Sequence, residues 1–524
     1  MPPATGTAGV APAGKQRLGK PDSARLRALL ALVAGTALAA AFAPLNLWPL
    51  AVLAPALLMW LWQDASPREA ARLGFWFSFG TFAAGTYWLY FSVHILGHSP
   101  LWLAFGLMLG LAAIMGLYHA ALGYCVARWL PRGGLTAWLV VTPAAWLFME
   151  WWRGWFLSGF SWLSLGYSQT DTWFASFAPL LGVYGISALL LVCAGAVVAV
   201  VLGTPRQRLI AAATFCIPWA LGAALYWHSW THVSGPPVSV AVVQGAIIDK
   251  WVESNREEAL VRYESLTQQA LGKQLIVWPE SAPADLANNL VPFINKVYKE
   301  AHAHGSSIVM GVLRADGREP DVRYYNSVMA LGDQVSWYDK HHLVPFAEFF
   351  PVPQFVRTWL RIMALPYSDF TRGAAYQPPL PVAHLQLGAT ICYEDAYGST
   401  MIQVLPVADA LVNVTNDAWF GHSTARHQHF QIVRMRAMEA GRYLVRAAND
   451  GISGVLGPHG EVIARAAEFV PAVLVSKIVP MMGLTPYARL GNWLVVSLAV
   501  LALAYGLWVR NDRGRRARTA AGKS

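Results

Sequence analysis

Three segments of the sequence end an apolar run with a side chain that can do chemistry. LIVWPES leads to Glu280, VSWYDKHH leads to Lys340, and LGATICYED leads to Cys392. A thiol is a good nucleophile only as the thiolate, so it needs a base or a cation beside it. Glu280 could take the proton, and Lys340 could stabilise both the thiolate and an oxyanion. The three residue types together predict acyl transfer through a thioester.

Each of these residues taken singly has an ordinary explanation, because a Glu after a Pro or a Lys after a strand is usually a solvated charge. The surrounding pattern adds weight. Apolar, β-rich runs occur at 238–246, 274–278, 306–313, 325–331, 334–340, 384–392 and 410–415, and helical segments at 253–272, 291–304 and 424–441. Strands that alternate with helices predict a layered α/β domain. Side chains that close such strands often project from the carboxyl edge of a sheet, where α/β proteins build their sites.

The rest of the chain has the composition of a membrane protein. The 524 residues are 56% hydrophobic and only 13% charged, whereas soluble domains average about 25% charged residues. Apolar runs long enough to cross a bilayer lie near 26–43, 47–63, 73–95, 101–129, 136–153, 174–203, 209–228 and 490–509. The aromatic, Gly/Ser-rich stretch 154–171 is expected to lie at the membrane interface or to re-enter the membrane.

Basic residues are found in alternate loops between these runs. Arg68 and Arg72 follow the second run, further pairs follow the fourth and sixth, and the loop around His98 carries no Lys or Arg. The positive-inside rule then places both termini in the cytoplasm. The expected organisation is a basic N-terminus (1–25), a membrane domain of about seven spans (26–228), an extracytoplasmic domain (229–489, core 237–478), a last span (490–509) and a basic tail (510–524).

Several other functions are not supported by the sequence. The net charge of +10 is concentrated in the flanks 15–27 and 510–523, which abut apolar runs and suit anionic lipid, so no nucleic-acid partner is expected. The loosely grouped histidines are His341, His342, His422, His427 and His429. They lack metal-ligand spacing, and no CxxC pair exists, so neither a metal nor another cofactor is expected.

At this point the chain resembles a known family. WPE, YDKHHLVPF and ICYED, in that order, are similar to the Glu-Lys-Cys set of the nitrilase superfamily. HHLVPFAEFFP, NVTNDAWFG, HFQIVRMRAMEAGRYLVRAANDG and GLTPYARLGNW resemble its membrane-embedded branch, the apolipoprotein N-acyltransferases. The resemblance covers nearly the whole chain and shows no departure at the three catalytic positions. The residues up to about 20 and those after 510 match nothing distinctive.

The resemblance implies a multi-span helical membrane domain plus an extracytoplasmic α/β nitrilase-like domain, an α-β-β-α sandwich. It also implies a bacterial inner-membrane enzyme, acting as a monomer, whose catalytic domain faces the periplasm. Cys392 would attack a phospholipid ester and hold the acyl chain as a thioester. The α-amine of a diacylglyceryl-cysteine apolipoprotein would then accept the chain, which completes a ping-pong reaction. Glu280 would be the base and Lys340 would support the oxyanion.

Further residues receive supporting roles. Glu348 fits the family's second glutamate, which positions or neutralises the catalytic lysine. Tyr393 is expected to contribute a backbone donor, with its ring as packing, and Glu394 either orients the site or caps a turn. Trp419 and Phe420 are candidates for contact with an acyl chain, and packing as core aromatics is the alternative.

Two other functions remain open on the residues alone. A membrane-tethered amidase or nitrilase would share the three catalytic residues but would use water as its second nucleophile. A transporter or scaffold that only binds lipoproteins would need charged groups within the spans, and Glu150 and Arg153 are the main examples. Loss of Cys392 should be tolerated by a transporter and by neither enzyme.

Overall fold

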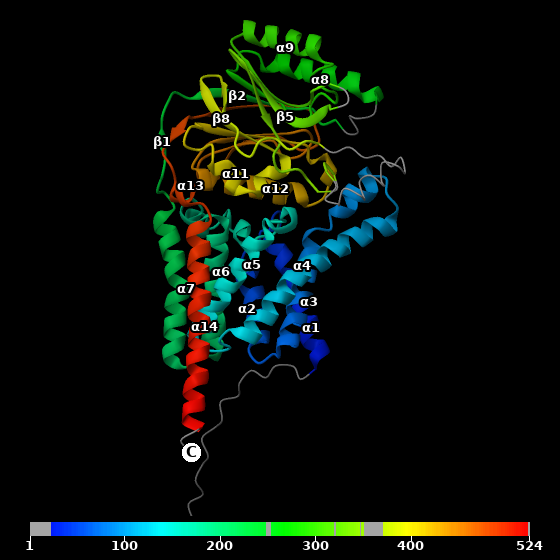
Figure 1. The fold of residues 1–524 in the computed structure, drawn as a ribbon. Helices are drawn as coiled ribbons and strands as arrows, with labels where there is room; N and C mark the ends of the chain where they lie inside the picture. Colours follow the sequence, from blue (N-terminus) through cyan, green and yellow to red (C-terminus); the bar gives the residue numbers. More distant parts are fainter. Residues whose placement is uncertain (1–22, 248–252, 319–320, 346, 350–369, 522–524) are drawn as a thin grey trace, which may run out of the picture.

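The computed structural model describes residues 23–247, 253–318, 321–345, 347–349 and 370–521. Figure 1 shows a bundle of long helices stacked beneath a layered α/β part, with the two parts in contact. Helices α8 and α9 cover the top of the α/β part, and α11 and α12 lie between its sheets and the bundle. The α-β-β-α sandwich is confirmed.

Two six-stranded sheets form the inner layers of the sandwich. The first has the order β13-β2-β3-β4-β5-β6 and the second the order β12-β11-β10-β9-β8-β7. The first comprises β2 (Val238–Gln244), β3 (Leu275–Val277), β4 (Ser307–Asp316), β5 (Arg323–Leu331), β6 (Val335–Asp339) and β13 (Ala472–Ile478). The second comprises β7 (Leu380–Val382), β8 (Leu385–Ile391), β9 (Ala410–Thr415), β10 (Leu444–Ala448), β11 (Gly454–Leu456) and β12 (Val462–Arg465). The strands β2-β3-β4 and β8-β9-β10 run parallel, and antiparallel strands flank them.

The apolar runs became strands because both of their faces are covered. In β2, Val240 and Val242 belong to the core between the sheets, whereas Ala241 and Val243 pack under the outer helices. Such a strand reads as a continuous apolar run rather than an alternating one. Every strand and helix expected between 238 and 441 is present, with shifts of a few residues at the ends.

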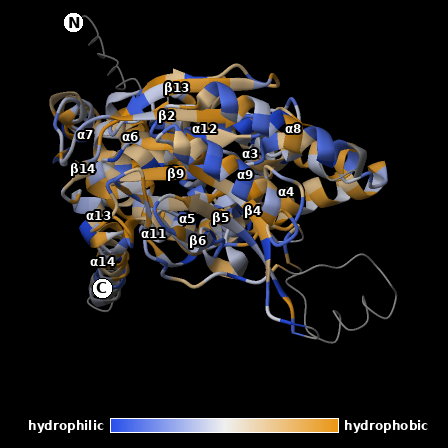
Figure 2. Cartoon of the chain, turned by 90° about the horizontal axis from the view of Figure 1, so that it is seen from above, coloured by the Kyte–Doolittle hydropathy of each residue, from blue (hydrophilic) through white to orange (hydrophobic). Residues whose placement is uncertain are grey.

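The outer helices differ in what covers them. Helix α8 (Glu253–Ala270) and α9 (Val291–Ala303) cover the first sheet, and Figure 2 shows many hydrophilic residues on α8. Helix α12 (Ala425–Ala440) is buried almost along its whole length. Phe430 and Val433 face the second sheet with α11 (Gly398–Ile402), whereas Ile432 and Met435 belong to the core of the helical bundle. Helix α12 therefore joins the two parts of the protein.

The helical bundle corresponds to the expected spans. It contains α1 (Ala24–Leu38), α2 (Leu50–Trp62), α3 (Pro67–Gly85), α4 (Leu101–Trp129), α5 (Thr142–Arg153), α6 (Ala178–Leu202), α7 (Pro205–Leu225) and α14 (Trp493–Ala521). Among the residues that the structure describes, five helical segments, those built on α1, α4, α6, α7 and α14, are long and apolar enough to cross a membrane, and α2 is apolar but shorter. These helices agree with a membrane protein. The number of times that the chain crosses the membrane stays a prediction.

The structure differs from the pattern of the sequence in three places. The expected span 73–95 is divided, because α3 ends at Gly85 and a separate π-helix, η2 (Phe91–Leu96), follows. Gly106 and Gly110 of α4 have the four-residue spacing that is typical of close helix packing in membranes, but a Cβ at either position would meet nothing within 4 Å. The strands after residue 441 were not predicted, because β10 contains a buried arginine and β11 and β12 have only three and four residues.

The stretch 154–171 lies between the bundle and the sandwich. It forms short 3-10 turns, and its Ser161 hydroxyl donates to the Ala396 carbonyl at 2.9 Å. Arg153 donates to the Phe160 and Trp162 carbonyls at 2.7 and 2.8 Å, and Glu150 accepts from the Leu165 amide at 3.1 Å. Glu150 and Arg153 thus hold this stretch in place beneath the sandwich. Residues 154–171 are called the floor below.

Candidate active site

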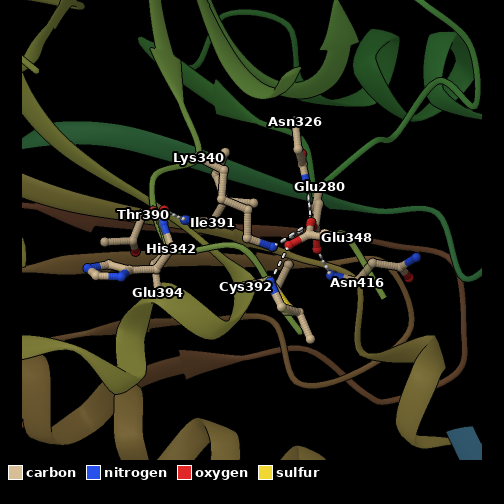
Figure 3. Close-up of polar contacts among 12 residues, drawn as sticks. Glu280, Asn326, Lys340, His342, Glu348, Thr390, Ile391, Cys392, Glu394 and Asn416 are labelled. Atoms are coloured by element: carbon tan, nitrogen blue, oxygen red, sulfur yellow. Dashed lines mark hydrogen bonds and ion pairs between the residues drawn. The ribbon is translucent and has the colours of Figure 1, made fainter. Parts of the chain in front are cut away.

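Three strand ends from two different sheets converge at one edge of the sandwich. Glu280 follows β3 by three residues, Lys340 directly follows β6, and Cys392 directly follows β8. Because β3 and β6 belong to one sheet and β8 to the other, the side chains meet in the space between the sheets. Figure 3 shows Cys392 next to the group formed by Glu280, Lys340 and Glu348. The structure therefore brings the predicted residues together.

A buried ammonium sits between two carboxylates. Lys340 Nζ lies 2.8 Å from Glu348 Oε1 and 3.5 Å from Glu280 Oε1, and its side chain is 1% exposed. Asn326 donates to both carboxylates, at 2.7 Å to Glu280 and 2.9 Å to Glu348. The backbone N–H of Asn416 donates to Glu280 Oε2 at 2.9 Å. These contacts hold each charged group in one orientation, as electrostatic catalysis requires.

The nucleophile candidate lies at a sharp turn in the backbone. Cys392 has φ of +51°, a left-handed conformation that costs a non-glycine residue on the order of 1 kcal/mol or more. It begins the short 3-10 helix η7 (Cys392–Ala396) immediately after β8. The turn redirects the chain at the sheet edge, so the Cys392 side chain leaves the strand next to the Lys340 group.

The electrostatics of the site favour a neutral thiol and a charged lysine. Burial raises the pKa of the Cys392 thiol, Glu280 raises it further, and Lys340 opposes both. Burial acts to lower the pKa of Lys340, but Glu348 and Glu280 outweigh it and the net shift is upward. A thiol held neutral in this way would have to lose its proton to act as a nucleophile, and the carboxylate of Glu280 is held beside the same ammonium.

Glu394 connects the loop that follows Lys340, residues 341–345 (the lysine loop), to the turn that begins at Cys392 (the nucleophile turn). Its carboxylate accepts from Tyr338 OH at 3.0 Å, from the His341 and His342 amides at 2.8 and 3.0 Å, and from the Ile391 amide at 2.9 Å. Burial raises its pKa to about 7, against the opposing effect of these backbone donors and Lys340. Glu394 both caps the turn at Ile391 and fixes the loop after Lys340, so the two alternatives for this residue are combined.

We expect Glu394→Gln to destabilise the protein by about 1–3 kcal/mol, the cost of leaving a buried polar group unsatisfied. The amide that replaces Oε2 would face the Ile391 N–H, so two donors would oppose each other at 2.9 Å. Thermal unfolding in detergent measures the effect, with Glu257→Gln on the exposed face of α8 as the matched control. Equal unfolding temperatures for the two variants would show that Glu394 does not hold the turn.

An aromatic cluster lies directly under the nucleophile turn. Tyr393 stacks on Trp162 of the floor with ring centroids 6.2 Å apart, and Phe420 contacts Trp88 at 4.9 Å and Trp162 at 6.1 Å. Tyr393 and Phe420 pack against the core of the helical bundle, so the packing role predicted for the Tyr393 ring is confirmed. Phe420 is half-buried, and its contact with an acyl chain stays a prediction. Trp419 is 46% exposed, and its contact with an acyl chain stays a prediction.

The sequence reasoning missed two residues that hold the carboxylates. Asn416 directly follows β9, but it contacts Glu280 through its backbone N–H, which the residue type does not reveal. Asn326 lies within β5, and nothing in its local sequence distinguishes it from an ordinary strand residue. The grouped histidines are dispersed in their contacts: His422 stacks on Phe469, His342 on Tyr397, and His429 bonds to Asp417.

Comparison with known proteins agrees with this geometry. Residues 239–487 match the Carbon-nitrogen hydrolase family, which defines the class of the sandwich and its site, and residues 34–196 match the Apolipoprotein N-acyltransferase N-terminal domain. Apolipoprotein N-acyltransferases from Methylococcus capsulatus and Azotobacter vinelandii are each 38% identical, over 94% and 91% of this chain and 98% and 94% of their own. The chain belongs to the apolipoprotein N-acyltransferase family.

Two solved structures align with part of this chain. A carbon–nitrogen hydrolase from Helicobacter pylori aligns with a TM-score of 0.36 and 17% identity, over 46% of this chain and 88% of that one. An amidase from Nesterenkonia aligns with a TM-score of 0.35 and 18% identity, over 49% of this chain and 94% of that one.

Proposed function

We propose that this acyltransferase works by a ping-pong mechanism in which a phospholipid donates the acyl chain to Cys392. The observation that supports it most directly is the position of Cys392. Its thiol lies beside the Glu280–Lys340–Glu348 group, and the next residue, Tyr393, packs on the aromatic floor of the membrane part. A nucleophile at this boundary can reach an ester group while the acyl chains remain in apolar surroundings, and each buried CH2 is worth about 0.8 kcal/mol.

In the first half-reaction Glu280 removes the thiol proton while the sulfur of Cys392 attacks the ester carbonyl of the phospholipid. Lys340 and the backbone N–H of Tyr393 stabilise the oxyanion of the tetrahedral intermediate. The C–O bond then breaks, the proton passes from Glu280 to the leaving alkoxide, and a lysophospholipid departs. The acyl chain remains on Cys392 as a thioester.

In the second half-reaction the α-amine of a diacylglyceryl-cysteine apolipoprotein attacks the thioester carbonyl. Glu280 accepts a proton from the amine, the C–S bond breaks, and the thiolate recovers that proton. The product is an amide, so the lipoprotein gains a third acyl chain. Glu348 keeps Lys340 charged and oriented through both halves, at an Nζ–Oε1 distance of 2.8 Å.

We further propose that the protein is a monomer in the bacterial inner membrane with the sandwich in the periplasm. Figure 1 shows that α1 begins and α14 ends at the side of the bundle that faces away from the sandwich. The arginines at the start of α3, at the end of α4, at the start of α7 and at the end of α14 then lie in the cytoplasm, as the positive-inside rule requires.

The experiment is the intact mass of the purified protein after incubation with a defined phospholipid. We expect one hydroxylamine-sensitive acyl adduct on the wild type and none on Cys392→Ala. Cys216→Ala is the matched control, because its thiol is exposed on α7, and it should acylate like the wild type. An adduct that survives in Cys392→Ala would place the nucleophile elsewhere.

The fate of the adduct separates transfer from hydrolysis. A diacylglyceryl peptide should discharge it with formation of an N-acylated peptide, whereas buffer alone should leave it in place. Rapid discharge by water would favour the amidase-like alternative. Full activity of Cys392→Ala in a lipoprotein maturation assay would contradict covalent catalysis altogether.

A further inference from the structure

A second group of buried polar residues lies on the other side of the nucleophile turn. His429 of α12 is 1% exposed, and its two ring nitrogens face different partners. Nε2 lies 3.2 Å from the carbonyl oxygen of Cys392, and Nδ1 lies 2.9 Å from Asp417 Oδ1. Trp162 and Phe420 enclose the ring at centroid distances of 5.7 and 6.1 Å. The mechanism described above uses none of these contacts except the Cys392 peptide.

Arg446 of β10 anchors this group from the sheet side. Its guanidinium lies 2.8 Å from Asp417 Oδ2 and 3.0 Å from His429 Nδ1, and it donates to Asn413 Oδ1 at 2.7 Å. Asp395, in η7, lies 3.5 Å from Arg446 and 3.9 Å from His429 Nε2. All of these charged side chains are buried, so each orientation is set by the others rather than by water.

The neighbours of His429 indicate which ring nitrogen carries a proton. Burial acts to raise the pKa of Asp417, but Arg446 and His429 hold it below its ordinary value, so this carboxylate is ionised. A neutral ring protonated only at Nδ1 would suit Asp417 but would turn the Nε2 lone pair toward the Cys392 carbonyl oxygen. A ring protonated only at Nε2 would instead turn its Nδ1 lone pair toward the Asp417 carboxylate. The imidazolium satisfies both acceptors, because it donates from Nδ1 to Asp417 and from Nε2 to the Cys392 carbonyl oxygen.

We propose that His429 is a positioning residue that orients and polarises the Cys392–Tyr393 peptide. The same peptide carries the Tyr393 N–H that the proposed mechanism uses as an oxyanion donor. A hydrogen bond to the carbonyl oxygen of an amide strengthens donation by its N–H. It also fixes the plane of a peptide whose first residue has the strained φ of +51°. His429 itself touches neither substrate nor thiol. The inference rests on the proposed role of Cys392 as the nucleophile.

The test compares two reactions of the same thiol. Attack on a phospholipid ester passes through a tetrahedral oxyanion, whereas alkylation by iodoacetamide does not. Polarisation of the peptide therefore accelerates only the first reaction. We measure the rate of acyl-enzyme formation by quenching and intact mass, and the alkylation rate of Cys392 by iodoacetamide at the same pH for every variant.

We expect His429→Leu, which has no donor, to slow acyl-enzyme formation by about tenfold to a hundredfold. This is less than the 10²–10³-fold loss typical when an oxyanion donor is removed outright. The rate at which iodoacetamide alkylates Cys392 in this variant should stay within about threefold of the wild-type rate. His429→Gln, whose amide can donate, should recover part of the acylation rate. His422→Gln is the control, because His422 is exposed on the same segment, and both of its rates should equal those of the wild type.

Two results would overturn the inference. Wild-type acylation by His429→Leu would show that the contact with the Cys392 carbonyl is idle. If the rates of acyl-enzyme formation and of alkylation by iodoacetamide fall equally in both His429→Leu and His429→Gln, the ring only supports the local fold. Absence of an adduct on Cys392 in the wild type would instead refute the proposed function, and the inference with it. The wild-type measurement therefore separates the two failures.

Discussion

Glu280→Gln should slow acyl-enzyme formation by about 10²–10⁴-fold, the range that general base catalysis contributes. The substitution keeps the shape of the side chain and removes its ability to accept the thiol proton. The neighbouring lysine stays charged, because Glu348 still lies 2.8 Å from Lys340 Nζ. The measurement is the single-turnover rate of acyl-enzyme formation at several pH values. The loss should shrink as the pH rises and hydroxide replaces the missing base.

Glu348→Gln is the natural comparison for Glu280→Gln. Both carboxylates contact Lys340 Nζ and both accept from Asn326, so the two variants disturb the same cluster. Glu348 is also tied to the lysine loop through the Val344 amide at 2.8 Å, which suits a positioning role. We therefore expect Glu348→Gln to lose less activity. An equal or larger loss than in Glu280→Gln would contradict the assignment of the base to Glu280.

Lys340→Met should reduce both activity and stability. The acylation rate should fall by about 10²–10³-fold, because the oxyanion loses a fixed positive charge. The free energy of unfolding should fall by about 3–5 kcal/mol, because removal of one partner leaves buried charges uncompensated. Here two carboxylates, 9% and 12% exposed, would face each other without the ammonium. Denaturant unfolding and single-turnover acylation measure the two effects.

A combined variant separates the two roles of Lys340. Lys340→Met together with Glu280→Gln and Glu348→Gln removes all three charges, so it should regain much of the lost stability and none of the activity. Lys296→Met on α9 is the control, because its side chain is 62% exposed and pairs with Glu264 at the surface. Stability in Lys340→Met that matches this control would show that the carboxylates do not depend on the ammonium.

Much of the site could be predicted from local sequence. Glu280, Lys340 and Cys392 each follow a strand whose apolar pattern is unambiguous. The carboxyl ends of such strands are where α/β proteins place polar side chains. The pattern of a buried strand depends on residues next to each other in the chain, so short segments suffice to recognise it. The chemistry of a thiol, a carboxylate and an ammonium then narrows the function further.

The parts that were missed depend on distant contacts. Asn326 is a functional neighbour only because β5 lies beside β6 and opposite β8 in the folded sandwich. Strand β10 was overlooked because Arg446, which is fully buried, interrupts its apolar run. Its charge is tolerated there because Asp417 and Asn413 reach it from other elements. No local pattern can indicate that a charged residue will be compensated in this way.

The amino-acid sequence by itself determined which segments are apolar enough to enter a bilayer, which form strands, and which reactive groups stand at the strand ends. These properties follow from the hydropathy and periodicity of neighbouring residues. Only the tertiary structure decided that two sheets present their strand ends to one another and that α12 is buried between a sheet and the bundle. Helix α12 carries Gln428, His429 and Glu439 as buried residues, although such polar side chains are typical of exposed helices. Gln428 accepts from Trp162 of the floor, Glu439 accepts from the Val183 amide of α6, and His429 contacts Asp417 of the sandwich. Burial of a polar group is favourable only where such partners meet it.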